Sequence, residues 1–386
     1  MDLDRRLLTS GDFYSQKFQT TEREDTLVLN LGPQHPSTHG VLRILLEIDG
    51  EYIIRAEPVL GYIHRMHEKI AEVMTYPQFS PYTGRIDYLH PLAWGWSHIG
   101  AVERLMDVQV PERAEFIRVI TCELNRISSH LLWWGAYVND LGAFTPFFYA
   151  FDDRELISDI LQRIIGSRLT FSFYRIGGVA TDIDDRFVAE TREFCNRMKE
   201  RLKMYKALVT DNFIFRNRLE GIGEIPFETC RKYGATGPVV RGSGKAYDVR
   251  RSEPYSIYDR FDFEIPVYHT CDAMGRYLVR MDEIRESIKI IEQALEALPQ
   301  GECINRKASK RPKPPPNDVY FAVEGARGKI GAHLVSDGGR SPYRLKLRSP
   351  SYSNLSLFAE VAQGTLIADA ISILGSLDLV IPEMDR

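Results

Sequence analysis

The stretch PERAEFIRVITCELNRISSHLLWWGAYVND, residues 111–140, decides the fold class of this chain. Proline is favoured at the first helical position, where its missing N–H costs no hydrogen bond, and Pro111 stands at such a position. No second proline interrupts the pattern, so we predict one helix over 111–139. The same reasoning predicts a bundle with five further helices, over residues 65–73, 87–107, 153–174, 182–210 and 272–298.

Three polar residues of the first helix, Glu123, Arg126 and His130, recur at i, i+3 and i+7 and form one stripe on a largely apolar segment. If the stripe is buried, its charges must be paired inside the protein, and such networks often relay protons or structural changes. If the stripe faces solvent, it is a surface row of salt bridges. The spacing alone does not decide between the two.

Two groups of predicted strands flank the helices. TLVLNLG, VLRILLEIDG and EYIIRAEPVL, within residues 26–60, read as three strands, and Asp49-Gly50 is a strong hairpin signal. Residues 319–350 alternate like strands as well, before a final apolar helix. We therefore predict an α+β architecture with a small N-terminal β-sheet, a long helix bundle and a C-terminal β-sheet.

Composition indicates where these parts begin and end. The stretch NRKASKRPKPPPND, residues 305–318, is basic and rich in proline. Its cations could bind acidic lipid or nucleic acid, but the proline run favours a semi-rigid spacer. We divide the chain into an N-terminal arm (1–24), the N-terminal sheet (25–60), the helical bundle (61–300) with an irregular segment (217–268), the linker (301–318) and a C-terminal unit of sheet, helix and tail (319–386).

Composition also excludes several classes of function. The formal net charge is -4, so we do not expect nucleic acid as a partner. The five cysteines are scattered without a CxxC pair, which fits a reducing compartment and argues against a cysteine-only metal cluster. No stretch reaches the roughly 18 apolar residues of a membrane-spanning helix, and the N-terminus lacks the apolar core of a signal peptide. We expect a soluble chain in a cytosol-like compartment.

Histidines concentrate near the N-terminus, where the loop GPQHPSTHG, residues 32–40, joins the first two predicted strands. Pro36 and the flanking glycines argue against a helix in this loop. The loop and the start of the next helix offer five candidate ligands for zinc or a similar metal: His35, His39, His64, His67 and Glu68. We prefer the alternative that the loop histidines cap backbone groups and that His67 lies at the surface.

Ten motifs occur along the chain in this order: LNLGPQHPSTHGVLR, GYIHRMHEK, GRIDYLHP, ELNRISSHLLWWG, DLGAFTPFFYAFDDRE, YRIGGVA, SGKAYDVRRSEPYS, RYLVRMDEIRES, SDGGRSPYRLKLRSPSYSNL and the terminal DR. With them the chain closely resembles the 49 kDa, or D-type, subunit of respiratory complex I, the proton-pumping NADH:quinone oxidoreductase. The resemblance runs from about Leu27 to Arg386. The H-type subunit of the ferredoxin-dependent plastid NDH complex shares most of the motifs.

This family is related to the large subunit of nickel-iron hydrogenases, so the resemblance implies a nickel-iron-hydrogenase-large-subunit-like fold. Hydrogenases hold their metals with two CxxC pairs. In this chain Asp87 and His90 occupy the positions of the first two cysteines, and Val380 and Glu383 occupy those of the second two. Arg386 stands where the hydrogenases have a histidine. Nickel prefers thiolates in such a site, so we expect no metal to be ligated by this chain. The resemblance implies that the remaining cavity is a quinone-headgroup pocket.

The resemblance also implies which residues act on the quinone. The headgroup is expected between His39 and Tyr88, which bind it and protonate it, and Asp140 is expected to partner His39 and to recharge or reorient it. A carboxylate that accepts from an imidazole fixes its tautomer and raises its pKa. The pocket or its loop is expected to include His35, Thr38 and Val380.

The electrons are expected from a 4Fe-4S cluster held by a neighbouring B-type subunit, with Arg65 and Arg85 facing that cluster. Further expected partners are the C-type (30 kDa), I-type (ferredoxin-like) and membrane-embedded H-type subunits of complex I. The chain would then lie peripherally on the cytoplasmic side of the bacterial inner membrane. In that setting the stripe of Glu123, Arg126 and His130 becomes a candidate relay that couples quinone chemistry to the membrane arm.

The chain departs from the family pattern at three places. Met66 stands where the family usually has glycine, and Pro382 stands where most members have glycine. Leu169 to Phe173 lacks a histidine that many members have near the cluster. That loss should remove pH dependence from the cluster potential and lower the potential, and a lower potential would suit a low-potential acceptor such as menaquinone.

Three alternative interpretations remain at this point. The first is a subunit of a ferredoxin-dependent NDH-type complex. The second is a relative of the membrane-bound hydrogenase large subunit, although the CxxC pairs are missing. The third is a non-catalytic scaffold that only shapes a subunit junction.

Overall fold

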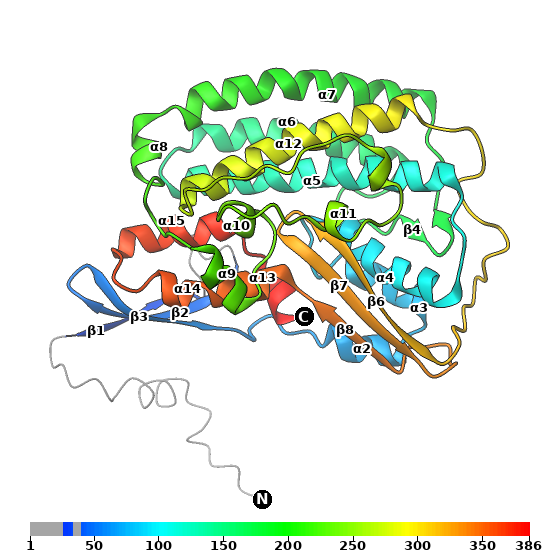
Figure 1. The fold of residues 1–386 in the computed structure, drawn as a ribbon, viewed down its shortest axis with the longest axis horizontal. Helices are drawn as coiled ribbons and strands as arrows, with labels where there is room; N and C mark the ends of the chain where they lie inside the picture. Colours follow the sequence, from blue (N-terminus) through cyan, green and yellow to red (C-terminus); the bar gives the residue numbers. More distant parts are fainter. Residues whose placement is uncertain (1–25, 34–39) are drawn as a thin grey trace, which may run out of the picture.

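The computed structural model describes residues 26–33 and 40–386. The predicted arm and the predicted site residues His35, Thr38 and His39 lie outside the described residues. Helices and sheets are mixed along the described part, so the predicted α+β class is confirmed (Figure 1).

Four long helices lie side by side along one side of the molecule, at the top of Figure 1. They are α5 (Glu112–Asp140), α6 (Thr145–Ile165), α7 (Asp185–Tyr205) and α12 (Ala273–Glu296). Helix α5 is buried along most of its length because the other helices pack against it. Trp134 stacks on Tyr205 of α7 with ring centroids 4.1 Å apart, and Trp133 contacts Tyr277 of α12. The apolar residues of 111–140 thus belong to a central helix.

The N-terminal sheet is an antiparallel meander of three strands. The strands are β1 (Leu27–Leu31), β2 (Arg43–Asp49) and β3 (Tyr52–Val59). Gly50 has φ 60° in the turn between β2 and β3, a conformation that glycine adopts at little cost. The predicted hairpin at Asp49-Gly50 is therefore confirmed.

Gly32 closes the base of the connection between β1 and β2. Its φ is +91°, and a Cβ atom at this position would lie 2.1 Å from the carbonyl oxygen of Leu42. Only glycine fits such a close approach of two backbone segments. The backbones at the two ends of the histidine loop, at Gly32 and at Leu42, therefore lie in close contact.

The C-terminal sheet is also antiparallel, and α4 (Pro91–Met106) packs on it. Its strands are β6 (Asn317–Gly325), β7 (Gly328–Ser336) and β8 (Arg344–Arg348). A Cβ atom at Gly100 of α4 would lie 2.3 Å from the ring of Phe321 on β6. Glycine at this position lets the helix approach the sheet closely.

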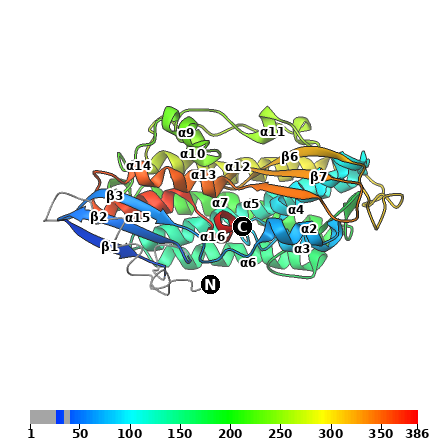
Figure 2. The same ribbon diagram turned by 90° about the horizontal axis from the view of Figure 1, so that it is seen from below.

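The last helices pack on the N-terminal sheet and share a buried apolar cluster with it. They are α13 (Pro350–Ser356), α14 (Phe358–Val361), α15 (Ile367–Leu377) and α16 (Ile381–Asp385). The N–H of Ile53 on β3 donates to the carbonyl oxygen of Thr365 at 2.9 Å. Figure 2 shows α16 and the C-terminus near the middle of the molecule. The two ends of the described chain thus form one packed unit.

Shorter elements connect these parts. They are α2 (His67–Val73), α3 (Tyr76–Thr83), β4 (Tyr174–Arg175), β5 (Gly178–Val179), the π-helix η3 (Lys206–Thr210), α8 (Phe213–Asn217), α9 (Phe227–Tyr233), α10 (Pro238–Arg241), α11 (Val249–Ser252) and the 3-10 helix η4 (Tyr258–Arg260). Among the helices of the described residues, none has the length and apolar character needed to span a bilayer.

Three helices were predicted with wrong boundaries. The helix expected over 87–107 is α4, which begins only at Pro91. The helix expected over 153–174 is α6, which begins eight residues earlier because Pro146 occupies its first turn, and ends before Gly166 at φ 83°. The cap expected at Asp182 is Asp184, whose carboxylate accepts from the N–H of Phe187 at 2.8 Å.

Two other predicted helix starts are close to the structure. The cap expected at Asp272 is confirmed, since its carboxylate accepts from the N–H of Gly275 at 2.8 Å. Pro111 is the residue before the first turn of α5, and Glu112 is the first helical residue.

Candidate functional site

Tyr88 lies in a tight turn that Asp87 holds in place. Oδ1 of Asp87 accepts hydrogen bonds from the backbone N–H groups of Leu89 at 2.9 Å and His90 at 3.2 Å. A carboxylate that binds N–H groups two and three residues ahead folds the chain into an Asx turn, here directly before α4. Asp87 and His90 are buried, whereas Tyr88 is only half-buried. The turn is thus a rigid support for one accessible phenol.

The surroundings of Tyr88 keep its phenol protonated. Burial raises the pKa of Tyr88 above its ordinary value, and the negative charges of Asp87 and Asp378 add to this effect. A neutral phenol donates a hydrogen bond at physiological pH. The group can therefore serve as a donor to a carbonyl oxygen of a ligand.

Five buried charged side chains lie beside this turn, and we call them the carboxylate–arginine cluster: Asp87, Asp378, Glu383, Arg280 and Arg327. Nη1 of Arg327 donates to Oδ2 of Asp87 at 2.9 Å, and its Nη2 lies 3.5 Å from Oδ1 of Asp378. Nε of Arg280 lies 3.7 Å from Oδ2 of Asp378. Buried charges of opposite sign offset each other's desolvation. The cluster joins α12, the β6–β7 turn and the C-terminal tail to the turn of Tyr88.

Glu383 differs from the other carboxylates because its hydrogen bonds come from serines. Its Oε1 accepts from Oγ of Ser349 at 2.9 Å, and its Oε2 accepts from Oγ of Ser351 at 2.9 Å. Burial and the nearby charge of Asp87 raise the pKa of Glu383 to about 7 in spite of Arg327. This carboxyl can therefore take up or release a proton near neutral pH.

Both ring nitrogens of His90 form hydrogen bonds with the backbone. Its Nε2–H donates to the carbonyl oxygen of Cys122 at 3.2 Å, and its Nδ1 accepts from the N–H of Ala326 at 3.0 Å. Burial lowers the pKa of His90 well below its ordinary value, so the ring stays neutral. Both ring nitrogens are used, which leaves no lone pair for a metal ion.

The residues after the loop do not gather into a metal site either. Nδ1 of His64 bonds to the carbonyl oxygen of Asp385 at 2.5 Å. His67 is buried, contrary to the expected surface position, and burial lowers its pKa to about 4. The carboxylate of Glu68 accepts from Arg344 at 2.9 Å. Over residues 26–33 and 40–386, no three His, Cys, Asp or Glu side chains are grouped to hold a metal ion.

The C-terminal tail connects Val380 to the histidine loop. Val380 is buried, and its N–H donates to Oγ of Ser351 at 3.4 Å. The next residue, Ile381, faces Gly40, since a Cβ atom at Gly40 would lie 3.2 Å from Cγ1 of Ile381. Gly40 directly follows His39 in the sequence. The end of the predicted quinone loop thus lies against the tail.

Asp140 is the last residue of α5 and is half-buried. One turn earlier, the hydroxyl of Tyr137 donates to the carbonyl oxygen of Ser372 on α15 at 2.8 Å. Burial raises the pKa of Tyr137, and the charge of Asp140 contributes to the rise. Asp140 therefore lies at the end of the bundle that faces α15. Its predicted pairing with His39 involves a residue outside the described part and stays a prediction.

Arg65 and Arg85 lie together at the surface. Nη2 of Arg65 donates to the carbonyl oxygen of Arg85 at 2.6 Å, and Arg85 donates to the carbonyl oxygen of Pro81. Between Arg65 and α2, Met66 has φ 54°. This left-handed conformation is costly for a side chain with a Cβ atom, which gives a reason for the glycine of the family pattern.

The segment that lacks the expected histidine packs beside Arg85. A Cβ atom at Gly84 would lie 3.1 Å from the carbonyl oxygen of Phe171 and 3.4 Å from the carbonyl carbon of Thr170. Thr170 has φ 52° and is half-buried. The two departures at Met66 and Thr170 thus lie on segments that meet near the arginine pair. The effect of Thr170 on a cluster potential stays a prediction.

The stripe of α5 is buried, so the solvent-facing alternative is wrong. Glu123 accepts from Nε of Arg126 at 3.0 Å and from Nη1 of Arg250 at 3.2 Å. The hydroxyls of Tyr258 and Ser287 donate to the same carboxylate, each at 2.7 Å. Burial alone would raise the pKa of Glu123, but the charges of Arg126 and Arg250 lower it to about 2. This glutamate therefore stays ionised at physiological pH.

His130 belongs to a second part of the network. Its Nε2 lies 3.0 Å from Oε2 of Glu283, and Nε of Arg241 donates to Oε1 of the same glutamate at 2.8 Å. Burial lowers the pKa of His130, although Glu283 acts in the opposite direction. The preceding residue, Ser129, accepts a hydrogen bond from Nη2 of Arg327 at 3.1 Å. The network of α5 therefore adjoins the carboxylate–arginine cluster.

Sequence reasoning missed Arg280 and Arg327, which supply all the positive charge of the cluster, and the two serines that bind Glu383. Arg327 lies in a short hairpin turn between β6 and β7, where a cation is unremarkable. The only available signal for the serines was the Ser-Pro-Ser run at 349–351 inside a family motif.

The chain is similar to known proteins over nearly its whole length. The profile of the family "Respiratory-chain NADH dehydrogenase, 49 Kd subunit" matches residues 140–314 and 306–386. The D-type subunit of the NADH-quinone oxidoreductase of Desulfotalea psychrophila is 59% identical over 363 residues, which cover 94% of this chain and 98% of that protein. A D-type subunit of Opitutus terrae is 57% identical, with 94% and 91% covered. The D-type subunit of Syntrophobacter fumaroxidans is 55% identical, with 96% and 100% covered.

Fold and site define a class of redox-complex subunit that shares the fold of the hydrogenase large subunit. Within this class, the chain belongs to the family of the 49 kDa subunits of the respiratory-chain NADH dehydrogenase. It is therefore one subunit of a multi-subunit NADH:quinone oxidoreductase, complex I.

Proposed function

We propose that this chain forms the pocket in which the complex reduces its quinone, at the turn of Tyr88 and the 32–40 loop. The relatives at 55% identity and above are named as subunits of NADH-quinone oxidoreductase. The observation that carries the proposal is the environment of Tyr88. A half-buried phenol, kept neutral, stands on a rigid turn beside a cluster that contains the titratable carboxyl of Glu383.

Reduction of a quinone to a quinol takes two electrons and two protons. In the proposed mechanism Tyr88 donates to one carbonyl oxygen of the headgroup and His39 to the other, and each transfers a proton as the electrons arrive. Asp140 orients His39 and returns a proton to it. Glu383 holds a proton near neutral pH and resupplies the side of Tyr88 through the cluster. His35, Thr38 and Val380 line the pocket.

The electrons come from a 4Fe-4S cluster of a neighbouring B-type subunit, which we propose to dock at the edge that carries Arg65 and Arg85. Two exposed guanidinium groups on adjoining segments support this choice, because cations near a cluster stabilise its reduced form. The C-type, I-type and membrane-embedded H-type subunits complete the surroundings. We propose a peripheral position on the cytoplasmic side of the bacterial inner membrane.

We further propose that the buried network of α5 couples the pocket to the membrane arm. Glu123 and Arg126 serve as fixed charges, since the pKa of Glu123 is held at about 2. The responsive part is His130 with Glu283, because its neighbour Ser129 binds Arg327 of the cluster. A change in the charge of the carboxylate–arginine cluster then acts on His130 and Glu283 through Ser129 of α5.

The test uses the purified complex with Tyr88→Phe or His39→Ala. We expect NADH:quinone activity to fall about 100-fold, because each change removes a proton donor. NADH oxidation by ferricyanide, which does not need the quinone site, should be unchanged. Tyr52→Phe, at an exposed hairpin tyrosine, is the matched control and should keep both activities. Full quinone activity in both the Tyr88→Phe and His39→Ala complexes would refute the proposal.

A further inference from the structure

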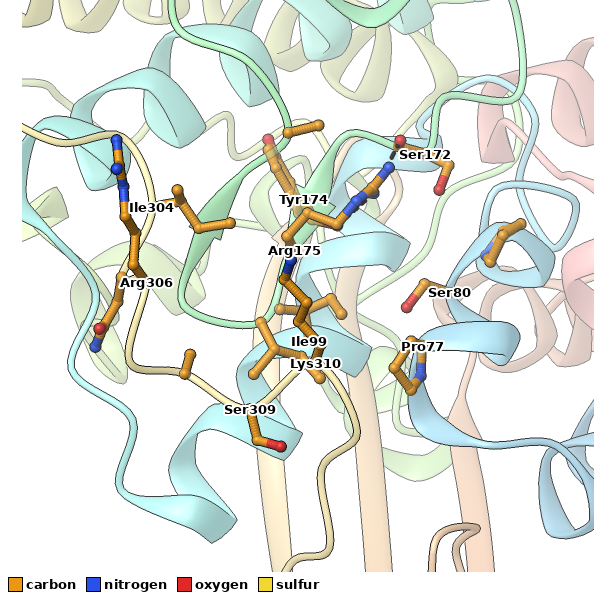
Figure 3. A pocket seen from close by; sticks show the side chains of 15 residues that line it. Pro77, Ser80, Ile99, Ser172, Tyr174, Arg175, Ile304, Arg306, Ser309 and Lys310 are labelled. Carbon is orange, nitrogen blue, oxygen red and sulfur yellow. Dashed lines mark hydrogen bonds between the residues drawn. The ribbon is translucent and has the colours of Figure 1, made fainter.

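A cavity of about 860 Å³ lies between the β4–β5 hairpin, α3 and the linker. Figure 3 shows Ile99, Ile304, Arg175 and Lys310 around it. A second hollow of about 310 Å³ shares Pro77 and Lys310 with the first. The two hollows therefore adjoin, and we call them together the linker groove.

The linker groove is lined by cations and by no carboxylate. Neither hollow has an Asp or Glu among its lining residues. Its five cations are Arg175, Arg306, Lys310, Arg311 and Arg340. A concave surface with charges of one sign concentrates the field and attracts groups of the opposite sign.

These cations are poorly neutralised within the chain. The side chain of Arg175 donates to the carbonyl oxygens of Ser172 at 3.1 Å and Tyr174 at 3.0 Å, and burial lowers its pKa with no carboxylate to oppose the shift. Arg306 lies 3.2 Å from an exposed carboxylate, that of Glu302. Within the described ranges, this is the only ion pair formed by the cations of the groove.

The wall made by the linker is anchored at both ends. The N–H of Asn305 donates to the carbonyl oxygen of Gly177 at 2.8 Å. Oγ of Ser336 on β7 donates to the carbonyl oxygen of Pro314 at 2.8 Å. The segment between these anchors is not a detached spacer, and the groove that it borders is largely preformed.

The floor of the groove is apolar, with Ile99, Ile176 and Ile304 from three separate segments and Pro77 and Pro81 from α3. A ligand must therefore combine negative charges with apolar side chains. A flat anionic membrane surface would reach the exposed rim and leave this recessed floor empty. An extended peptide with carboxylates and apolar residues satisfies both parts of the groove.

We propose that the linker groove binds an extended acidic peptide segment of a neighbouring subunit of the complex. The groove is concave, preformed, apolar at its floor and positively charged at its rim. The inference depends on the chain being one subunit of a larger complex and not on the assignment of the quinone pocket. Failure of the Tyr88→Phe test would leave it intact.

The experiment is photo-cross-linking in the purified complex with Ser309→p-benzoylphenylalanine, which places the probe on the linker wall. The cross-linked peptide is identified by mass spectrometry. We expect a segment of another subunit with an excess of Asp and Glu. Lys310→Glu or Arg311→Glu in the same chain should lower the yield about tenfold, because like charges then face each other. Lys203→Glu, at another exposed cation, on α7, is the control and should leave the yield unchanged.

The neutral variant Lys310→Met separates loss of charge from misassembly. It should lower the yield less than Lys310→Glu, in complexes that keep their ferricyanide activity. Cross-links to lipid, to a segment without excess carboxylates, or to nothing would overturn the proposal. A yield that does not respond to charge reversal would overturn it as well.

Discussion

Two buried glutamates of this chain have pKa values shifted in opposite directions. Both Glu123 and Glu383 are fully buried. Two arginines bind the carboxylate of Glu123, and its pKa falls to about 2, whereas two serine hydroxyls bind Glu383, and its pKa rises to about 7. The partner, and not the depth of burial, therefore decides which residue is a fixed charge and which can exchange a proton.

Glu383→Gln should make the stability of the chain less dependent on pH. Between the ordinary value of 4.5 and about 7 the unfolded chain releases a proton that folded Glu383 retains. The stabilising contribution is therefore complete below 4.5 and is lost as the pH rises through about 7. We expect the free energy of unfolding of the wild type, relative to Glu383→Gln, to fall by about 3 kcal/mol across this range.

Urea unfolding of both proteins at about pH 5 and about pH 8 measures this difference. The conservative amide keeps the two serine hydroxyls occupied, so the variant should fold. Ser356→Ala, at a half-buried serine at the end of α13, is a control that should leave the pH profile unchanged. Parallel profiles for wild type and Glu383→Gln would show that the carboxyl of Glu383 does not titrate in this range.

Some of the individual site residues could be predicted from the sequence, and others could not. The RIDYLH motif and the terminal residues pointed to Asp87, Tyr88 and Glu383 by resemblance. Arg327, which binds Asp87, is 240 residues away along the chain. Neither periodicity nor local composition reports such a contact, so the charge balance of the cluster emerged only from the tertiary structure.

At the scale of helices and strands, the local sequence pattern predicted an element correctly where the pattern was strong and no proline or charged run obscured it. The apolar pattern of 111–140 gave α5 to within one residue at each end, and Asp49-Gly50 marked its hairpin. Helix α6 was misplaced because the charged run after Asp152 resembles a helix start, while the true start is an aromatic stretch after Phe144. Helix α3 was missed because it contains Pro77 and Pro81. Proline in the first turn is compatible with a helix, but two prolines conceal the pattern.

The packing of α4 on β6 depends on one glycine, and Gly100→Ala tests it. The new Cβ atom would lie 2.3 Å from the ring of Phe321, so helix and sheet must separate or the ring must move. We expect the free energy of unfolding to fall by about 2 kcal/mol. Trp94 and Trp96 lie on the same helix, so tryptophan fluorescence in urea follows the change.

Gly95→Ala on the same helix is the matched control. A Cβ atom at Gly95 has no neighbour closer than 3.7 Å, and alanine favours the helix. This substitution should raise the free energy of unfolding by about 0.5 to 1 kcal/mol. Equal effects of the two substitutions would mean that propensity, and not the contact with Phe321, governs position 100.

At the scale of the whole molecule, the C-terminal tail contacts segments that lie far from it in the sequence. The carboxylate of Asp385 accepts from the N–H groups of Gly61 and Ile63, each at 2.9 Å. The tail thereby holds the segment that leads to Arg65, while Ile381 packs against Gly40 at the end of the histidine loop. One short tail thus contacts both the segment that leads to Arg65 and Gly40, the residue that directly follows His39 in the sequence. The predicted sheet and bundle did not reveal this connection, because it joins residues more than 300 positions apart.

Asp385→Asn should loosen this connection without altering any residue proposed to touch the quinone. The amide offers one acceptor oxygen and turns a donor toward an N–H group, so at least one of the two hydrogen bonds to Gly61 and Ile63 is lost. Hydrogen bonds to a charged acceptor are worth about 1.5 to 3 kcal/mol each, and the local opening free energy should fall by a similar amount. Hydrogen exchange of peptides spanning 58–66 in the purified complex measures it, with Asp259→Asn at an exposed carboxylate as the control. Faster exchange confined to 58–66 would show that the carboxylate of Asp385 holds this segment in place. Unchanged exchange would show that apolar packing of α16 and the hydrogen bond of His64 to the carbonyl oxygen of Asp385 are sufficient.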